Sequence, residues 1–234
     1  MQCLRRLLVV ALSHFRNGAG MPENSMSRVW IFDLDDTLHD ASSHIFPVMN
    51  RAMTQYIMDT LEMDETAAFK LRQHYWRVYG TTMKGLMRHH GVDPAHFLLT
   101  THDVLDLPNM VLQSKGLQES ILRLPGRKVI FTNAPRKYAL AVLELLGIAH
   151  LFEIVFSVES SRYHPKPSIR GFRQLLKKIK ANPADCVMIE DNAPALMTAK
   201  RMGMKTIHIT KKLHKPVYVD ARIGNVLALS RLKI

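Results

Sequence analysis

Two aspartates stand one residue apart directly after a short apolar run, and they are the residues best suited to chemistry in this sequence. The apolar run is Val29-Trp30-Ile31-Phe32, and the segment after it is Asp33-Leu34-Asp35-Asp36-Thr37. Because alternate side chains share one face of a strand, Asp33 and Asp35 could reach the same site where the backbone leaves a sheet. Such a pair suits a divalent cation, with one carboxylate attacking and the other moving protons. The alternative is a polar turn that ends a strand, since aspartate is common in turns.

Polar residues also follow three later apolar runs. Thr132 and Asn133 follow residues 128–131, Lys166 stands between two prolines after residues 154–156, and Glu190 and Asp191 follow residues 187–189. Taken singly, the first and last pairs could cap a helix, and the lysine could be a solvated surface side chain. In an open parallel sheet, however, ligands bind beyond the carboxyl ends of the strands. One shared site explains four such strand ends better than four independent coincidences.

These residue types fit chemistry at a phosphate monoester. Attack on such a group brings an anion toward an anion, so the site needs positive charge and fixed hydrogen-bond donors. Mg²⁺ favours a few carboxylates together with phosphate and water, and Asp33, Asp191 and the Asp35 backbone carbonyl would provide its protein ligands. We expect the phosphoryl oxygens to be held by backbone N–H groups and by three side chains, those of Thr132, Asn133 and Lys166.

The elements that must position these residues follow from the spacing of apolar residues. Helical spacing covers residues 44–60, 64–80, 83–90, a segment from residue 94, and 116–124, and Pro125-Gly126 ends this region. Short apolar runs at 128–131, 154–156, 187–189 and 205–209 then alternate with amphipathic helices. Such alternation indicates an α/β fold, with a parallel sheet covered on both faces and a helical insertion after the first strand. The segment after Thr210 could continue the sheet edge or pack on the core.

We divide the chain into three parts on this basis. Residues 28–40 and 125–234 are expected to form the core, residues 41–124 a helical cap, and residues 1–27 a loosely ordered extension. Within the extension, Arg5 and Arg6 precede an apolar stretch that weakly resembles a targeting signal but is too short to span a bilayer. We therefore expect no membrane association and a cytoplasmic location, with a reduced, buried Cys186.

Composition narrows the class of protein. The chain has 234 residues, 47% of them hydrophobic, two cysteines and a formal net charge of +12. Two cysteines exclude a disulfide framework. A basic surface could attract nucleic acid, acidic membranes or anionic small substrates. No nucleic-acid-binding motif accompanies the charge, so we expect a solvated basic face and a small phosphorylated metabolite as the partner.

The ordered set of residues resembles the haloacid dehalogenase superfamily over residues 28–210. The resemblance rests on four motifs, namely Asp33 to Thr37, Thr132, Lys166 and Glu190-Asp191. It implies a Rossmann-like sheet with strand order 5-4-1-2-3 and a helical cap inserted after the first strand. The commonest first motif has glycine where this chain has Asp36, a side chain that we expect to point away from Asp33.

The resemblance also implies roles for individual residues. Asp33 would be the nucleophile that forms an aspartyl-phosphate, and Asp35 would protonate the leaving alcohol and then activate water. Asp33, Asp35 and Asp191 would bind Mg²⁺, with Glu190 as an additional ligand or as a partner of the ligands. Dehalogenase chemistry is disfavoured, because dehalogenases of this superfamily lack a carboxylate at the position of Asp35.

Substrate choice is expected to reside in the cap. The segment 75–86 combines aromatic, hydroxyl and basic groups, and its candidate substrate residues are Tyr75, Tyr79, Thr81, Thr82 and Lys84. Together with Asp106-Leu107-Pro108, this segment is similar to the pyrimidine 5′-nucleotidase branch of the superfamily, which implies action on nucleoside 5′-monophosphates. Two alternatives stay open: a phosphoglycolate or sugar-phosphate phosphatase or phosphomutase on the same core, and a catalytically silent module that binds nucleic acid or has a regulatory role.

Overall fold

A computed structural model describes residues 28–232 of the chain, so the extension expected at residues 1–27 lies outside the described residues. Within that range, six parallel strands form one sheet in the order β3-β2-β1-β4-β5-β6. The strands are β1 (Val29–Phe32), β2 (Arg127–Phe131), β3 (Ile154–Phe156), β4 (Cys186–Glu190), β5 (Lys205–Ile209) and β6 (Ala221–Ile223). The predicted α/β class and the order 5-4-1-2-3 are confirmed. The segment after Thr210 adds β6 at the sheet edge.

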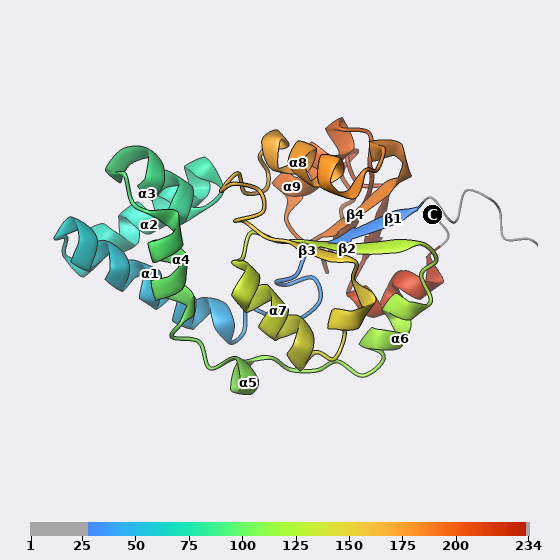
Figure 1. Ribbon diagram of the computed structural model, residues 1–234, viewed down its shortest axis with the longest axis horizontal. Helices are drawn as coiled ribbons and strands as arrows, with labels where there is room; N and C mark the ends of the chain where they lie inside the picture. Colours follow the sequence, from blue (N-terminus) through green and yellow to red (C-terminus); the bar gives the residue numbers. More distant parts are fainter. Residues whose placement is uncertain (1–27, 233–234) are drawn as a thin grey trace, which may run out of the picture.

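Helices cover both faces of the sheet, as Figure 1 shows. Helices α8 (Ile169–Ile179) and α9 (Ala193–Arg201) lie above it, while α7 (Arg136–Leu145) and α6 (Leu117–Leu122) lie below. The alternation of side chains along β1 explains the two layers. Ile31 packs in the cluster that includes α8 and α9, and Phe32 packs in the cluster that includes α7 and α6.

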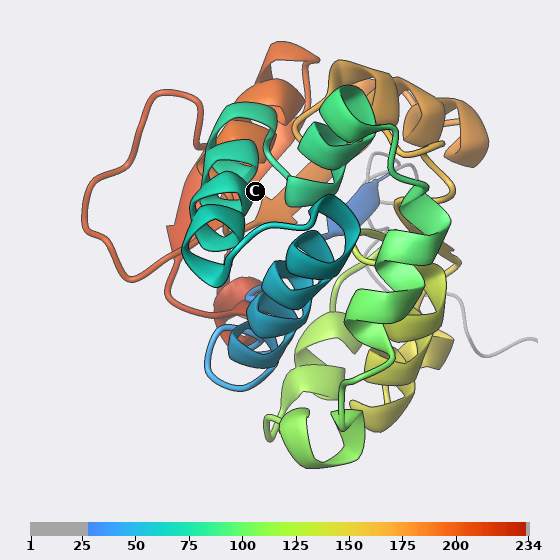
Figure 2. The same cartoon turned by 90° about the vertical axis from the view of Figure 1, so that its left-hand side faces the viewer.

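The cap consists of helices that have a hydrophobic cluster of their own. It contains α1 (Ile45–Leu61), α2 (Glu65–Tyr79), α3 (Thr82–His90) and α4 (Pro94–His102), which stand at the left of Figure 1 and in front in Figure 2. Side-chain oxygens of Asp64, Thr81 and Asp93 accept backbone N–H groups at the starts of α2, α3 and α4. These N-caps explain why the helical spacing breaks where it does.

The chain returns from the cap to the core through α5 (Leu107–Met110) and α6. Leu117 and Ile121 of α6 belong to the same buried cluster as the sheet residues. The Ser120 hydroxyl donates a hydrogen bond to the Val226 carbonyl, in a 3-10 helix η4 (Val226–Arg231) that follows β6. Two further 3-10 helices, η2 (Ala149–Leu151) and η3 (Pro183–Asp185), precede β3 and β4.

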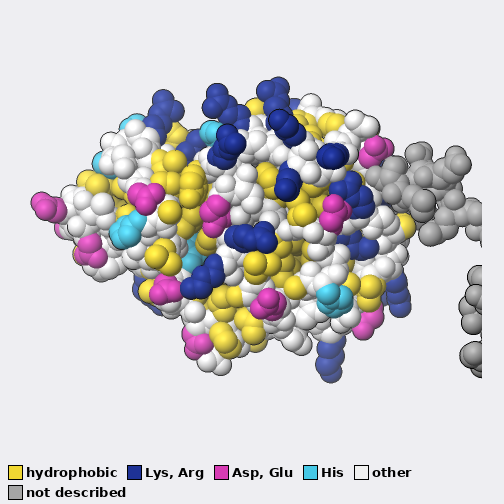
Figure 3. Space-filling view, viewed as in Figure 1, with side chains coloured by type: hydrophobic (Ala, Val, Ile, Leu, Met, Phe, Trp, Pro, Cys, Tyr) yellow, Lys and Arg dark blue, Asp and Glu magenta, His cyan; other side chains and the backbone are white. Residues whose placement is uncertain are grey.

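Basic side chains gather on the polar side of α8. Arg170, Arg173, Lys177, Lys178 and Lys180 are all exposed there. Lysine and arginine side chains are prominent along the upper edge of Figure 3, above the region where α8 lies in Figure 1. Between residues 28 and 232, no helix is long and apolar enough to cross a membrane.

Candidate active site

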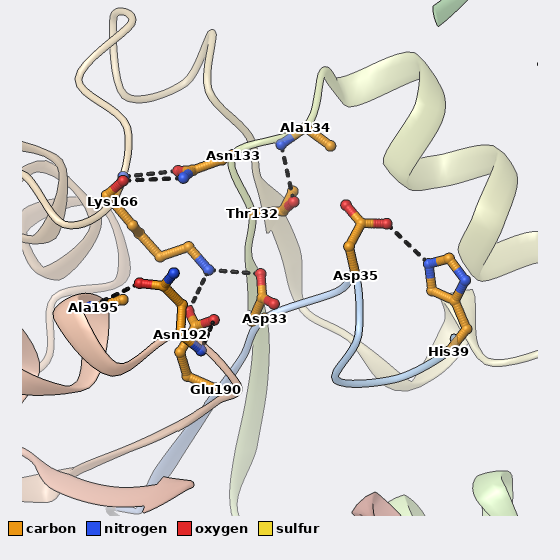
Figure 4. Close-up of polar contacts among 10 residues, drawn as sticks. All are labelled: Asp33, Asp35, His39, Thr132, Asn133, Ala134, Lys166, Glu190, Asn192 and Ala195. Carbon is orange, nitrogen blue, oxygen red and sulfur yellow. Dashed lines mark hydrogen bonds and ion pairs between the residues drawn. The ribbon is translucent and has the colours of Figure 1, made fainter. Parts of the chain in front are cut away.

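The strand order places the predicted residues together at the carboxyl ends of the strands. Strand β1 lies between β2 and β4, with Phe32 opposite both Ile130 and Ile189. The residues that follow these strands therefore emerge side by side, and the Asp33 N–H extends the ladder by donating to the Ile189 carbonyl at 3.0 Å. Figure 4 shows Asp33, Thr132 and Glu190 converging on the same space. The strand order reverses here, and α/β sheets bind ligands beyond the carboxyl ends of the strands at such a point.

Lys166 forms the centre of the buried charges. Its ammonium Nζ lies 2.6 Å from Asp33 Oδ1 and 2.6 Å from Glu190 Oε2, and the lysine is only 5% exposed. Burial alone lowers the pKa of Lys166, but the Asp33 and Glu190 carboxylates outweigh it, so the pKa is raised and the ammonium stays charged. Lys166 thus supplies a permanent positive charge beside Asp33.

Three carboxylates at this edge could hold a metal ion. One oxygen from each of Asp33, Glu190 and Asp191 lies within 4.8 Å of the others. Burial and the neighbouring Asp33 charge raise the pKa of Asp191 to about 6, and burial raises that of Glu190. One ammonium does not balance three carboxylates, and a small cluster of hard oxygens is the donor set that Mg²⁺ prefers. The residues present therefore fit Mg²⁺. That Glu190 is an additional ligand or a partner of the ligands stays a prediction.

The Asp35 side chain turns away from this cluster. Its Oδ1 accepts a hydrogen bond from the Tyr138 hydroxyl at 2.6 Å and lies 3.0 Å from His39 Nε2. Figure 4 shows the carboxylate directed toward His39, on the side opposite Lys166. Burial and the Asp35 charge raise the pKa of Tyr138, so the phenol keeps its proton. Asp35 is thus placed apart from the cluster of Asp33, Glu190 and Asp191, with its own set of contacts.

Sequence reasoning missed both partners of Asp35. Tyr138 lies on the apolar face of α7, where it is 3% exposed and packs edge-on against His102. The available signal was its hydroxyl, because a buried tyrosine usually needs a hydrogen-bond partner. His39 lies four residues after Asp35, in a turn that closes through a bridge between the two residues.

Thr132 and Asn133 are adjacent in sequence, but their side chains have different hydrogen-bond partners. Thr132 is buried, and its Oγ1 accepts the Ala134 N–H at 3.0 Å, which leaves its own hydroxyl proton for another acceptor. The Asn133 amide instead contacts the Lys166 backbone, accepting its N–H at 2.7 Å and donating to its carbonyl at 3.0 Å. Asn133 therefore holds the loop that carries Lys166, while its phosphate-binding role remains a prediction.

Asp36 has a local structural task. It adopts a left-handed backbone with φ of 58°, which aspartate tolerates better than most residues. Its Oδ1 accepts the N–H groups of Ala41 and Ser42, and its Oδ2 accepts the Ser42 hydroxyl. Where the related motif commonly has glycine, the aspartate here ties together the loop that leads into the cap.

The candidate substrate residues of the cap are distributed over several environments. Tyr75 is 6% exposed and bonds to His90, Tyr79 bonds to His89, and the Thr82 hydroxyl donates to the Arg72 carbonyl. These hydroxyls are thus engaged within the cap itself. Thr81 caps α3 by accepting the Lys84 N–H at 3.2 Å. Lys84 is partly exposed, and its charge helps to lower the pKa of His164, chiefly lowered by burial.

The turn between α2 and α3 nevertheless reaches the loop that carries Lys166. A Cβ atom placed on Gly80 would lie 3.1 Å from Cδ of Pro167 and 3.7 Å from the Lys166 carbonyl oxygen. Gly80 also has φ of +81°, a conformation in which glycine is preferred. The cap therefore contacts the core directly at the loop that carries Lys166.

The chain is similar in sequence to known proteins. Residues 30–209 match the family model described as haloacid dehalogenase-like hydrolase. The chain is 26% identical over 197 residues to phosphate metabolism protein 8 of Saccharomyces cerevisiae, covering 78% of this chain and 61% of that protein. It is 22% identical to the pyrophosphatase PpaX of Bacillus velezensis, covering 87% and 96%, and 24% identical to a phosphoglycolate phosphatase of Colwellia psychrerythraea, covering 78% and 84%. The match thus spans less than two thirds of the yeast relative's length.

Solved structures with the same fold are more distant in sequence. CbbY from Rhodobacter sphaeroides, solved with phosphate, is 17% identical with a TM-score of 0.63, covering 87% of this chain and 96% of that one. YfnB from Bacillus subtilis, solved with magnesium, is 17% identical with a TM-score of 0.60, covering 88% and 98%. At such identities the likeness establishes the fold alone.

Proposed function

The chain belongs to the haloacid dehalogenase-like hydrolase family, and we propose that it is a Mg²⁺-dependent phosphomonoesterase that acts through an aspartyl-phosphate on Asp33. The observation that carries the proposal is the position of Asp33, 2.6 Å from a buried lysine ammonium and within a cluster of three carboxylates. A nucleophile, a fixed positive charge and a set of metal ligands are what attack on a phosphate monoester requires.

In the first half of the reaction, a carboxylate oxygen of Asp33 attacks phosphorus while the bond to the leaving oxygen breaks. Asp35 donates a proton to that oxygen, so that an alcohol leaves rather than an alkoxide. The Lys166 ammonium and the Thr132 hydroxyl hold phosphoryl oxygens. Asp33, Asp191 and the Asp35 carbonyl would hold Mg²⁺, with Glu190 as an additional ligand or as a partner of the ligands, and the metal would supply positive charge against the phosphate oxygens.

The second half removes the phosphoryl group. Asp35, now a carboxylate, takes a proton from water as that water attacks phosphorus, and the bond to Asp33 breaks. Inorganic phosphate leaves, Asp33 returns as a carboxylate and Asp35 is again protonated. The same side chain thus serves as acid and then as base, which requires it to stay outside the metal-binding cluster but close to Asp33.

For the substrate we propose a nucleoside 5′-monophosphate, with a pyrimidine base preferred. The support is the similarity of the cap segment 75–86 to the pyrimidine 5′-nucleotidase branch, together with the contact of its Gly80 turn with the Lys166 loop. Phosphoglycolate is the second candidate, because a relative of that name aligns over 78% of this chain. A catalytically silent module is disfavoured because the acidic and basic residues of the site are all retained.

A phosphate-release screen tests both the proposed mechanism and the proposed substrate. The purified protein would be assayed with and without Mg²⁺ on nucleoside monophosphates, phosphoglycolate and sugar phosphates, with Asp33→Asn as the control. We expect Mg²⁺-dependent turnover that Asp33→Asn abolishes without loss of the fold. Near-normal turnover by Asp33→Asn would contradict the mechanism. A higher kcat/KM for phosphoglycolate or a sugar phosphate than for every nucleotide would contradict the substrate.

A further inference from the structure

Two residues from different parts of the chain bond to the same oxygen of Asp35. The Tyr138 hydroxyl, on α7, lies 2.6 Å from Oδ1, and His39 Nε2, in the loop before the cap, lies 3.0 Å from it. Figure 4 shows the other carboxylate oxygen of Asp35 directed away from His39, toward the side of Thr132. One oxygen of the carboxylate is therefore held, while the other is directed toward the side of Thr132.

His39 is a buried hydrogen-bond partner of Asp35. The side chain is 1% exposed, and its Nδ1 is buried without a hydrogen-bond partner among the described residues. With a hydrogen on Nε2, the His39 imidazole donates to Asp35 Oδ1.

Tyr138 is itself held in place by packing. Its ring lies edge-on to His102 at the end of α4, with a centroid distance of 5.5 Å. An ionised carboxylate can only accept, so the phenol donates. Two donors that approach one oxygen from α7 and from the 35–39 turn fix the rotation of the Asp35 carboxylate.

We propose that Tyr138 and His39 are positioning residues that hold Asp35 by Oδ1, so that Oδ2 is presented for proton transfer to the leaving oxygen. The inference rests on the proposed phosphatase mechanism. A general acid must lie within hydrogen-bond reach of the atom that it protonates, and a freely rotating carboxylate meets that requirement only part of the time. Loss of either donor therefore weakens proton transfer without removing the nucleophile, the lysine or the metal ligands.

The test uses the dependence of the rate on the leaving group. Tyr138→Phe keeps the ring against His102 and removes only the hydroxyl. We expect kcat/KM for an alkyl phosphate to fall about 10- to 100-fold, which is part of the roughly 10²- to 10⁴-fold that general acid catalysis supplies. The activated substrate p-nitrophenyl phosphate releases p-nitrophenolate, an anion that can leave without protonation. Its kcat/KM should therefore fall less than about threefold. Because kcat/KM reports formation of the aspartyl-phosphate, the later hydrolysis step does not obscure the comparison.

Matched variants separate positioning from general damage. His39→Leu should show the same selective loss, and His39→Gln should restore much of it by returning an N–H donor near the position of Nε2. Tyr56→Phe is the control, because it removes another buried hydroxyl that bonds to a histidine, within the cap. It should leave the ratio of the two kcat/KM values unchanged.

A double variant shows whether Tyr138 acts through Asp35. In the background of Asp35→Asn, Tyr138→Phe should cost little further activity, because the group that it positions is already lost. Equal losses on the alkyl and aryl phosphates, or full additivity with Asp35→Asn, would overturn the positioning role. Failure of the underlying mechanism gives a different result, since the unmodified protein would then lack Mg²⁺-dependent phosphatase activity or Asp33→Asn would retain it.

Discussion

Asn133 holds Lys166 by its backbone. The amide accepts the Lys166 N–H at 2.7 Å and donates to the Lys166 carbonyl at 3.0 Å, so both hydrogen bonds join the same two residues. The lysine side chain then extends in the opposite direction, to Asp33 and Glu190, as Figure 4 shows. The second residue after β2 thus fixes the loop after β3, and the buried ammonium depends on an amide 33 positions earlier in the sequence.

Replacing Asn133 with alanine should loosen that loop. We expect the free energy of unfolding to fall by about 1–3 kcal/mol, since each of two hydrogen bonds contributes about 0.5–1.5 kcal/mol. We also expect a lower kcat/KM, because the ammonium is no longer held beside Asp33. Urea denaturation and phosphate release measure the two effects. Asn109→Ala, which removes an exposed hydrogen bond to Asp106, is the control and should change neither. An unaltered urea midpoint for Asn133→Ala would contradict the inference.

Lys166 itself should be required for stability as well as for turnover. Lys166→Met leaves Asp33 and Glu190 as buried carboxylates without their cation, and breaking a buried ion pair costs about 3–5 kcal/mol. The double variant Lys166→Met with Glu190→Gln should recover part of that stability because one of the uncompensated charges is removed. Activity should remain absent in both. If the single and double variants unfolded at the same urea concentration, the charge explanation would be wrong.

The raised pKa of Asp191 should make the affinity for Mg²⁺ depend on pH. Its pKa is raised to about 6, first by burial and then by the Asp33 charge. The folded, metal-free protein therefore holds a proton at pH values where the unfolded chain has released it, and this group makes a contribution to stability that declines as pH rises from about 4 toward 6. Since the metal needs the carboxylate, Mg²⁺ affinity should fall below about pH 6, with uptake of Mg²⁺ releasing a proton.

Calorimetric titration with Mg²⁺ in buffers of different ionisation enthalpy measures that proton release. Asp191→Asn should bind Mg²⁺ far more weakly at every pH. Proton release that is the same at pH 5.5 and pH 8 would count against the assignment of Asp191 as a ligand.

The parts of the fold that were predictable are those that a single segment encodes. The strands before Asp33 and Asp191 are buried along their whole length, and the strand before Thr132 is buried over its last three residues, which are apolar because the sheet is covered on both faces. Strand β6 lacks that signature, since Ala221 and Arg222 are only partly buried. It forms by pairing with β5, and this pairing is not visible in its own three residues.

The candidate site also combines residues that the sequence predicts with a contact that it does not. The charges of Asp33, Lys166 and Asp191 could be grouped from the sequence because they follow successive strands. The contact of Tyr138 with Asp35 could not, because it spans 103 positions and joins a helix to a loop. Tyr138 also satisfies the apolar pattern of its helix, so packing alone accounts for its presence. Only the geometry reveals that its hydroxyl has a polar partner.

Gly80 offers a test of the contact between the cap and the core. Gly80→Ala would strain a backbone with φ of +81° and place a Cβ 3.1 Å from Pro167 Cδ. Gly116→Ala is a matched control, because Gly116 has φ of +83° but open space around its Cβ position. Both variants should lose about 1–2 kcal/mol of stability from the left-handed conformation. Only Gly80→Ala should also lower kcat/KM, because it pushes the cap away from the loop that carries Lys166. Equal kcat/KM values for the two variants would show that this contact does not serve turnover.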